Sequence, residues 1–192
     1  MTYFSSQMTE PDWKSCNEED FWSYIAWHLS KAGIESVLVG GAVVAIYSEG
    51  LYRSGDVDLV LEGWPLKPVA EVLEPLGFRP SGRHWSHPSC AHLYLEFPPG
   101  PVSLGEQYPV IPAELEKEGQ RLKLLSPTDC VKDRLAAWIH WKSRSRLDQA
   151  ALVASRQDGA VDFEEVRRWC GKEGAPTAYD DLLAAVQNLG ME

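Results

Sequence analysis

A glycine pair followed by two closely spaced aspartates constrains the fold of this chain more than any other feature. An apolar run ends in Gly40 and Gly41, and after a gap of fourteen residues the chain reads Asp-Val-Asp-Leu-Val from Asp56. The first run predicts a strand over 34–39, and the apolar residues around the aspartates predict a second strand over 56–61. Because side chains alternate along a strand, the two aspartates point to the same face.

Each half of this pattern suits one part of a phosphate-transfer site. Gly40 and Gly41 have no Cβ, so the backbone there can approach a phosphate closely. Asp56 and Asp58 repel each other unless a cation lies between them, and hard divalent ions accept carboxylate and phosphate oxygens together. The pattern predicts Mg²⁺ or Mn²⁺ at the aspartates. The structural alternative is a tight strand-to-helix turn followed by a strand with one solvated face.

This combination resembles the signature of the nucleotidyltransferase superfamily, which has the polymerase-β-like fold. That signature is an apolar residue, Gly-Gly or Gly-Ser, a short gap, and Asp-x-Asp between apolar residues. The chain looks closest to small bacterial members related to the toxins of abortive-infection and toxin–antitoxin systems, in which an Arg precedes the aspartates as Arg53 does here. The resemblance covers 34–61 and, more loosely, 92–154.

The resemblance implies an activity and a set of partners. It implies a Mg²⁺- or Mn²⁺-dependent enzyme that transfers a nucleotide from a nucleoside triphosphate to an RNA end, a protein hydroxyl or a small molecule. An antitoxin is a further partner that it implies. The alternative is a non-catalytic member of the fold that acts as a binding or toxin–antitoxin interaction module.

The superfamily also implies a third carboxylate on a neighbouring strand, and Glu96 is the candidate. The predicted strand 92–97 alternates apolar residues with His92, Tyr94 and Glu96, so these three share a face. A carboxylate on a buried face needs a metal ion or a cationic side chain beside it. We therefore expect Glu96 to act with Asp56 and Asp58 as a catalytic residue and metal ligand. The alternative is an edge strand whose outer face is solvated.

The nucleotide is expected to contact the glycine pair and two cations. Arg53 precedes the aspartates, and Lys132 lies early in a helix after the last predicted strand, where related proteins place a Lys. That helix has a strong start, with Ser126 as cap and proline at the first position. Gly40, Gly41, Arg53 and Lys132 are therefore the expected nucleotide-binding residues. For either cation the alternative is a solvated surface side chain.

Hydrophobic periodicity predicts helices and strands together in the first part of the chain and helices alone after it. Predicted helices cover 18–31, 42–48, 65–76, 127–141, 147–154, 161–171 and 178–189, and predicted strands cover 34–39, 56–61, 78–83, 92–97, 108–111 and 121–125. We expect an α/β (α+β) fold in which a nucleotidyltransferase-like mixed sheet is flanked by helices. The α/β domain is expected over 1–125, with a C-terminal helical lobe over 126–192.

Composition excludes several classes of protein. The net charge of −10 argues against a general nucleic-acid coat protein, although residues 121–172 carry eleven Lys and Arg against seven Asp and Glu. No apolar run is long enough to span a membrane. The four cysteines are scattered without paired spacing, and the first residues lack the pattern of a signal peptide. These features predict reduced thiols and a cytoplasmic protein.

One cluster of metal-type residues stands outside the proposed site. His84, His87, Cys90 and His92 are compactly spaced but lack a paired Cys-x-x-Cys knuckle. We expect a hairpin loop with incidental histidines, and a zinc-stabilised structural protein is the alternative.

Overall fold

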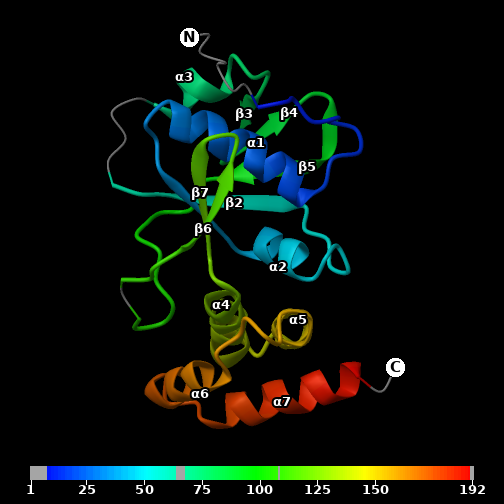
Figure 1. Cartoon of the computed structure of the whole chain (residues 1–192), viewed down its shortest axis with the longest axis vertical. Helices are drawn as coiled ribbons and strands as arrows, with labels where there is room; N and C mark the ends of the chain where they lie inside the picture. The colour runs from blue at the N-terminus through cyan, green and yellow to red at the C-terminus, as the bar shows by residue number, and fades with distance from the viewer. Residues whose placement is uncertain (1–7, 64–67, 108, 191–192) are drawn as a thin grey trace. The chain divides into compact units, whose positions relative to one another are not determined.

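The computed structural model contains a mixed β-sheet (Figure 1). The model describes residues 8–63, 68–107 and 109–190. Over those residues the sheet has seven strands in the order β3-β4-β5-β2-β1-β7-β6. The strands are β1 (Ser36–Val39), β2 (Asp56–Leu61), β3 (Arg79–Ser81), β4 (His84–His87), β5 (Cys90–Glu96), β6 (Ala113–Lys117) and β7 (Gln120–Leu124). β2 runs parallel to β5 and β1 parallel to β7, and the other neighbours are antiparallel. The expected mixed α/β fold is confirmed.

Contacts along the chain define two compact units. The first unit is Met1–Ala42, Ser54–Pro101 and Pro112–Leu124. The second unit is Val43–Arg53, Val102–Ile111 and Leu125–Glu192. The first unit therefore contains the whole sheet, and the second combines the C-terminal helices with two segments from earlier in the chain.

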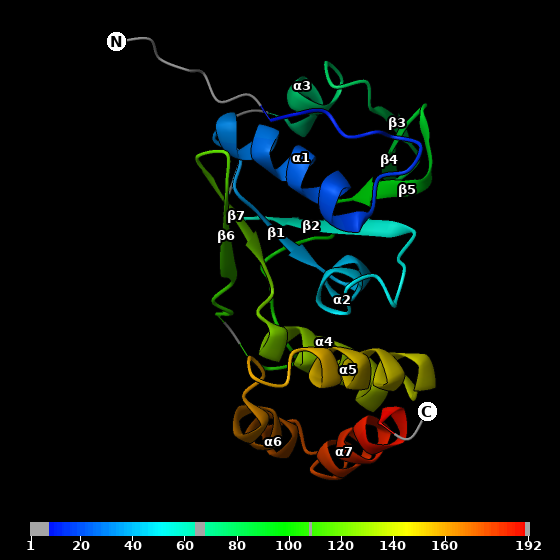
Figure 2. The same ribbon diagram turned by 45° about the vertical axis from the view of Figure 1, so that its right-hand side comes forward.

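In the first unit, helix α1 (Glu18–Lys31) covers the sheet and is fixed at its start by a capping box. The Asn17 side chain accepts a hydrogen bond from the Asp20 N–H at 2.8 Å, and the Asp20 carboxylate accepts one from the Asn17 N–H. The buried side of the helix includes Phe21, Ile25 and Leu29, none of which is exposed to solvent. Figure 2 shows α1 lying against the sheet, where it packs on β1 and β7. The short helix α3 (Val69–Leu73) packs against α1.

The second unit is built on four long helices. They are α4 (Pro127–Trp141), α5 (Arg144–Arg156), α6 (Phe163–Lys172) and α7 (Thr177–Leu189). At the start of α4, the Ser126 hydroxyl accepts a hydrogen bond from the Asp129 N–H at 3.0 Å and Pro127 occupies the first turn, as the sequence predicts. α4 packs on α5 and α6, and α7 packs on α5 and α6. α2 (Gly41–Tyr47) begins in the first unit, and its remainder belongs to the second.

The sequence predicts neither β4 nor β6, and the structure corrects both assignments. β4 lies in the segment expected to be a loop with incidental histidines, and its sequence His-Trp-Ser-His has no apolar alternation. β6 lies in the expected loop after residue 101. It is an edge strand with no buried residue, so its sequence carries no periodic apolar signal.

Two further predicted elements include residues that the structure does not describe. The predicted strand at 108–111 begins at Tyr108, which lies outside the described residues, and residues 109–111 form no strand. The predicted helix over 65–76 begins at Pro65, which is also outside them, and the helix described there is the shorter α3. Among the helices of the described ranges, none combines the length and the apolarity needed to cross a bilayer.

Candidate active site

The two aspartates of the Asp-x-Asp pattern lie on β2, the central strand of the sheet. Asp56 and Asp58 are half-buried, whereas Val57 and Leu59 between and after them are fully buried on the other face. This alternation places both carboxylates on one face. The Ser54 hydroxyl donates a hydrogen bond to Asp56 Oδ1 at 2.7 Å, which fixes the orientation of that carboxylate.

Glu96 reaches the same face because of the register between β2 and β5. In this parallel pair, Asp56 lies beside Tyr94 and Asp58 lies beside Glu96. Directly paired residues of neighbouring strands point to the same side of a sheet. Asp56, Asp58 and Glu96 therefore share a face, together with the Tyr94 ring. The sequence predicts the alternation along each strand, and the structure supplies the pairing.

The Tyr94 hydroxyl is affected by all three carboxylates. Loss of solvent raises the pKa of the Tyr94 hydroxyl, and the negative charges of Asp56, Glu96 and Asp58 raise it further. Arg83 opposes this shift of the pKa. Tyr94 therefore keeps its proton at neutral pH and can donate a hydrogen bond on the carboxylate face. The centroid of the His84 ring, on β4, lies 4.8 Å from that of the Tyr94 ring.

Glu96 also has a cationic partner. Arg83 Nε lies 3.4 Å from Glu96 Oε1, and the Arg83 side chain is 87% exposed while that of Glu96 is 21% exposed. An ion pair with one solvated member contributes little to stability and can open at small cost. Arg83 can therefore leave Glu96 when another cation arrives.

Gly40 brings the backbone directly against this face. Its φ of +76° lies in the region that glycine adopts readily, and a Cβ built on it would overlap Asp58 Oδ2. Any other residue at position 40 would displace the Asp58 carboxylate. Gly41 follows as the first residue of α2. The group that Gly40 approaches in this structure is the Asp58 side chain, and the approach of the glycine pair to a phosphate stays a prediction.

These residues fit a hard divalent cation by their donor chemistry. Carboxylate oxygens are the protein ligands that Mg²⁺ prefers, and Mg²⁺ keeps other positions for water or phosphate. Among the residues that the structure describes, the trio of metal-type ligand atoms that all lie within 4.8 Å of one another is Cys16, Cys90 and His92. The carboxylate oxygens of Asp56, Asp58 and Glu96 do not all lie within that distance of one another.

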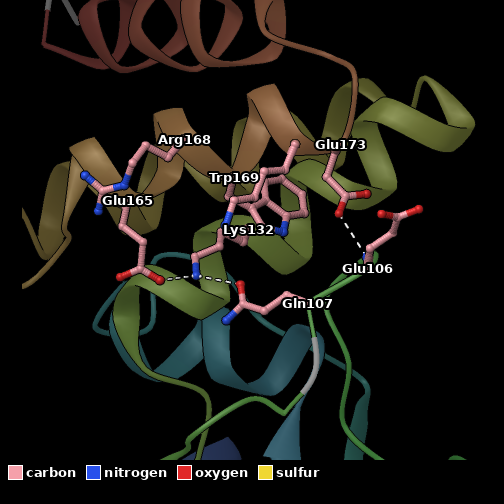
Figure 3. Close-up of a pocket in the computed structure, with 8 residues that line it drawn as sticks. Glu106, Gln107, Lys132, Glu165, Arg168, Trp169 and Glu173 are labelled. Atoms are coloured by element: carbon pink, nitrogen blue, oxygen red, sulfur yellow. Dashed lines mark hydrogen bonds and ion pairs between the residues drawn. The ribbon is translucent and has the colours of Figure 1, made fainter.

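Lys132 and Arg53, the predicted nucleotide-binding cations, belong to the second unit. Lys132 has no solvent exposure, and its Nζ donates to Glu165 Oε1 at 2.5 Å, Asp129 Oδ1 at 2.9 Å and Gln107 Oε1 at 3.0 Å. Figure 3 shows the Lys132 ammonium between the side chains of Glu165 and Gln107. Its three donors are therefore satisfied inside the protein. Arg53 lies exposed in the segment before β2.

Lys132 lies at a cavity of about 630 Å³ within the second unit (Figure 3). Its lining is balanced in charge, with three carboxylates and three cations around one indole ring: Glu106, Glu165, Glu173, Lys132, Arg168, Lys172 and Trp169. The Trp169 indole N–H donates to the Leu104 carbonyl at 3.2 Å, and Glu173 accepts from the Glu106 N–H at 2.9 Å. These contacts join Leu104 and Glu106 to α6 and to Glu173, the residue at its C-terminal cap. Because the charges of the lining balance, the cavity has no excess of positive charge for a triphosphate.

The compact histidine and cysteine cluster of the sequence is divided in the structure. The His84 ring lies tilted beside the Tyr94 ring, and the buried His87 stacks on Trp13 with ring centroids 4.3 Å apart. Burial lowers the pKa of His87, so it stays neutral at pH 7. Cys90 and His92 instead lie with Cys16, which is far away in the sequence. Sequence spacing indicated Cys90 and His92 but carried no signal for Cys16.

Comparison with known proteins gives one informative likeness. No family model and no curated protein matches this chain. The structure is similar to the crystal structure of an antigenic nucleotidyltransferase-like protein from Paracoccidioides brasiliensis, with a TM-score of 0.58 and 20% sequence identity. The match covers 92% of this chain and 88% of the other. The chain has a nucleotidyltransferase-like fold. At this identity the likeness concerns the fold, and the chemistry rests on the residues described above.

Proposed function

We propose that this protein is a metal-dependent nucleotidyltransferase whose active site is the carboxylate face of β2 and β5. The observation that carries the proposal is that Asp56, Asp58 and Glu96 share one face beside the backbone of Gly40. Three like charges so arranged repel one another, and a fold retains such an arrangement where a cation is bound. The nucleotidyltransferase-like fold of the neighbouring structure supports the same reading.

In this proposal Asp56 and Asp58 hold the ion, and Ser54 keeps the Asp56 carboxylate in place through its hydrogen bond. Bound Mg²⁺ or Mn²⁺ supplies a Lewis acid that withdraws charge from the phosphate oxygens. Gly40 lets the phosphate chain approach the backbone, and Tyr94 donates its hydroxyl proton as a hydrogen bond. Arg53 and Lys132 stay as predicted nucleotide contacts, and Lys132 would first have to leave its partners in the second unit.

The proposed reaction is a single displacement at the α-phosphate of a nucleoside triphosphate. A hydroxyl oxygen of the acceptor forms a bond to the α-phosphorus, and the bond to the bridging oxygen of the β-phosphate breaks. Pyrophosphate leaves with the electron pair of that bond. The hydroxyl proton passes to the Glu96 carboxylate once Arg83 has moved away, and from there to solvent.

The experiment that tests this proposal is an unbiased transfer assay. The protein is incubated with each α-labelled nucleoside triphosphate, Mg²⁺ or Mn²⁺, and total cellular RNA and protein. We expect label to enter one acceptor class, and Asp58→Asn to reduce the transfer by at least 100-fold. Glu62→Gln is the matched control, since Glu62 directly follows β2 but is exposed and paired with Lys123 at 2.6 Å. Equal transfer by wild type and Asp58→Asn would exclude this site.

The Glu96–Arg83 ion pair favours a second function. If the ion pair with Arg83 persists, Glu96 cannot accept the proton of the acceptor hydroxyl. The face could then bind a metal–nucleotide complex without catalysing transfer, and the protein would be a binding or toxin–antitoxin interaction module. This function predicts triphosphate binding with no label transfer. Arg83→Gln separates the two, because it frees Glu96 and would then start or increase the transfer.

A further inference from the structure

Cys16, Cys90 and His92 form a second cluster of metal-type ligands. It offers sulfur and nitrogen ligands, whereas the carboxylate face offers oxygen. Their ligand atoms all lie within 4.8 Å of one another, and both cysteines are buried while His92 is exposed. Cys16 lies just before the capping residue of α1, Cys90 begins β5, and His92 lies two residues along that strand. Two segments of chain with metal-type ligands thus meet at one point of the first unit.

The hydrogen bond made by His92 determines which of its nitrogens faces the thiols. His92 Nε2 lies 2.8 Å from the Cys16 carbonyl oxygen, and a carbonyl can only accept. Nε2 therefore carries the proton, and in the neutral ring the lone pair is on Nδ1. Nδ1 lies 3.8 Å from Cys90 Sγ. A histidine that donates its far nitrogen to a backbone carbonyl has the tautomer and orientation typical of a metal ligand.

The spacing of the cluster is close to that of a filled site. Bond lengths of about 2.3 Å to sulfur and about 2.0 Å to nitrogen place tetrahedral zinc ligands about 3.5 Å apart for a sulfur–nitrogen pair and about 3.8 Å apart for a sulfur pair. The distance of 3.8 Å from Cys90 Sγ to His92 Nδ1 is within a few tenths of an ångström of the value for a sulfur–nitrogen pair. Small side-chain rotations would close the site.

Both thiols are buried beside an imidazole whose lone pair faces them. A soft cation binds the thiolate form, so its binding would release the thiol protons.

A cavity adjoins one member of this cluster. Cys16 lines a cavity of about 270 Å³, and the carboxylates of Asp12 and Asp20 line the same cavity. Negative side chains around an opening raise the local concentration of cations. The exposed side of His92 leaves room for a fourth ligand from solvent.

We propose that Cys16, Cys90 and His92 bind a Zn²⁺ ion that joins the segment before α1 to β5. Two thiolates and one imidazole with a fourth position for water are a zinc donor set. The ion would fix the start of the strand that carries Tyr94 and Glu96. This site is independent of the proposed transfer reaction, because its ligands are soft and its role is structural.

The test uses fully reduced protein under anaerobic conditions, titrated with Co²⁺ as a spectroscopic probe and then with Zn²⁺. We expect one Co²⁺ per chain with thiolate-to-cobalt charge-transfer absorption and the strong visible bands of a tetrahedral ion, and we expect Zn²⁺ to displace it. Zn²⁺ should raise the melting temperature of wild type by several degrees, since ligand binding to the folded state stabilises it.

Variants distinguish this cluster from adventitious binding. Cys16→Ala and Cys90→Ala should each lose the charge-transfer band and the zinc-induced rise in melting temperature. Cys130→Ala and Cys170→Ala are matched controls, because they remove buried free thiols of the second unit and should leave both signals intact. His92→Gln, at an exposed position that tolerates substitution, should weaken zinc binding at least tenfold even if the cysteine variants fold poorly.

Three results would overturn the proposal. They are the absence of a thiolate–cobalt band in reduced wild type, an unchanged band in either cysteine variant of the cluster, and unchanged zinc affinity in His92→Gln. None of them bears on label transfer at the carboxylate face, so the two proposals fail separately.

Discussion

Carboxylates occur in two contrasting settings in this chain. On β2 and β5, Asp56, Asp58 and Glu96 share a face, and their charges add to the loss of solvent in raising the pKa of Tyr94. On α4 and α6, Asp129 and Glu165 both contact the buried ammonium of Lys132. In the first setting three negative side chains share one face of the sheet. In the second, two negative side chains form ion pairs with one buried positive side chain.

The difference shows how charge can serve folding or function. Lys132 would be very costly to bury alone, and its two carboxylates and the Gln107 amide offset that cost. The cluster around Lys132 therefore stabilises the second unit as it stands. The carboxylate face instead gathers acidic side chains beside one largely exposed cation, Arg83, and under the proposed function a bound metal ion would add stability there.

The sharpest test of this contrast is the removal of Lys132. Lys132→Met keeps the volume but leaves Asp129 and Glu165 facing an apolar side chain. We expect a loss of about 3–5 kcal/mol in the free energy of unfolding, because breaking a buried pair leaves an uncompensated charge. Urea denaturation measures it.

The result also decides the role of Lys132. A variant that keeps its stability and loses triphosphate affinity would show that Lys132 serves a nucleotide, and the contrast between the two settings would be broken. Lys172→Met is the control, since Lys172 lines the same cavity as an exposed side chain of α6. Its change should stay within about 0.5 kcal/mol.

The second prediction compares two glycines with the same backbone strain. Gly33 has φ +78° and Gly40 has φ +76°, but a Cβ at Gly33 would meet nothing within 4 Å whereas one at Gly40 would overlap Asp58 Oδ2. We expect Gly33→Ala to cost about 1–2 kcal/mol through the left-handed conformation alone. Gly40→Ala should cost at least as much and also abolish binding of a metal–triphosphate complex, measured by calorimetry. Retained binding in Gly40→Ala would separate the glycine from the site.

Part of the candidate site follows from the sequence because its signals are local. Alternation along one strand places Asp56 and Asp58 on one face, and the short gap ties them to Gly40. Capping residues gave the start of α1 and of α4 for the same reason, since a cap contacts the turn that it begins. That these residues bind metal and nucleotide remains a prediction.

Other features depend on contacts between distant segments and leave no local pattern. The pairing of β2 with β5 decides that Glu96 lies beside Asp58, and the sequence does not specify that register. The meeting of Cys16 with Cys90 joins segments more than seventy residues apart. The same holds for Lys132, whose partner Glu165 comes from another helix. An edge strand such as β6 is missed for a different reason, because both its faces are solvated.

The third prediction concerns Glu96 and has a smaller effect. Glu96→Gln removes one of the gathered charges and also an ion pair with Arg83, whose side chain is 87% exposed. A solvated ion pair contributes about 0–1 kcal/mol, so the two changes oppose each other. We expect the melting temperature of metal-free protein to stay the same or rise slightly, while label transfer falls by at least tenfold. A clear loss of stability would mean that Glu96 serves the fold, as Asp129 does beside Lys132.

The last prediction uses the Tyr94 hydroxyl as a probe of the gathered charges. Its pKa is raised by loss of solvent and by Asp56, Glu96 and Asp58. Asp56→Asn removes one of these charges and should lower the pKa of Tyr94 toward the value of a free tyrosine. Tyr24 is the internal control, because burial and Glu10 raise its pKa and Asp56 is not among the causes. The pKa values of both tyrosines are read from the ring carbon shifts of labelled protein in an NMR titration.

The direction of the stability change follows from the same shift. A raised pKa means that the folded state holds the Tyr94 proton more tightly than the unfolded state does. The stability that Tyr94 contributes is therefore complete below about pH 10, the ordinary value for tyrosine, and is lost as the pH rises through the folded-state pKa. Tyr94→Phe should reduce the fall in stability above pH 10, whereas Asp56→Asn should reduce it less. If Asp56→Asn leaves the Tyr94 titration unchanged, or moves Tyr24 equally, the carboxylates do not act together on this face and the contrast with Lys132 is lost.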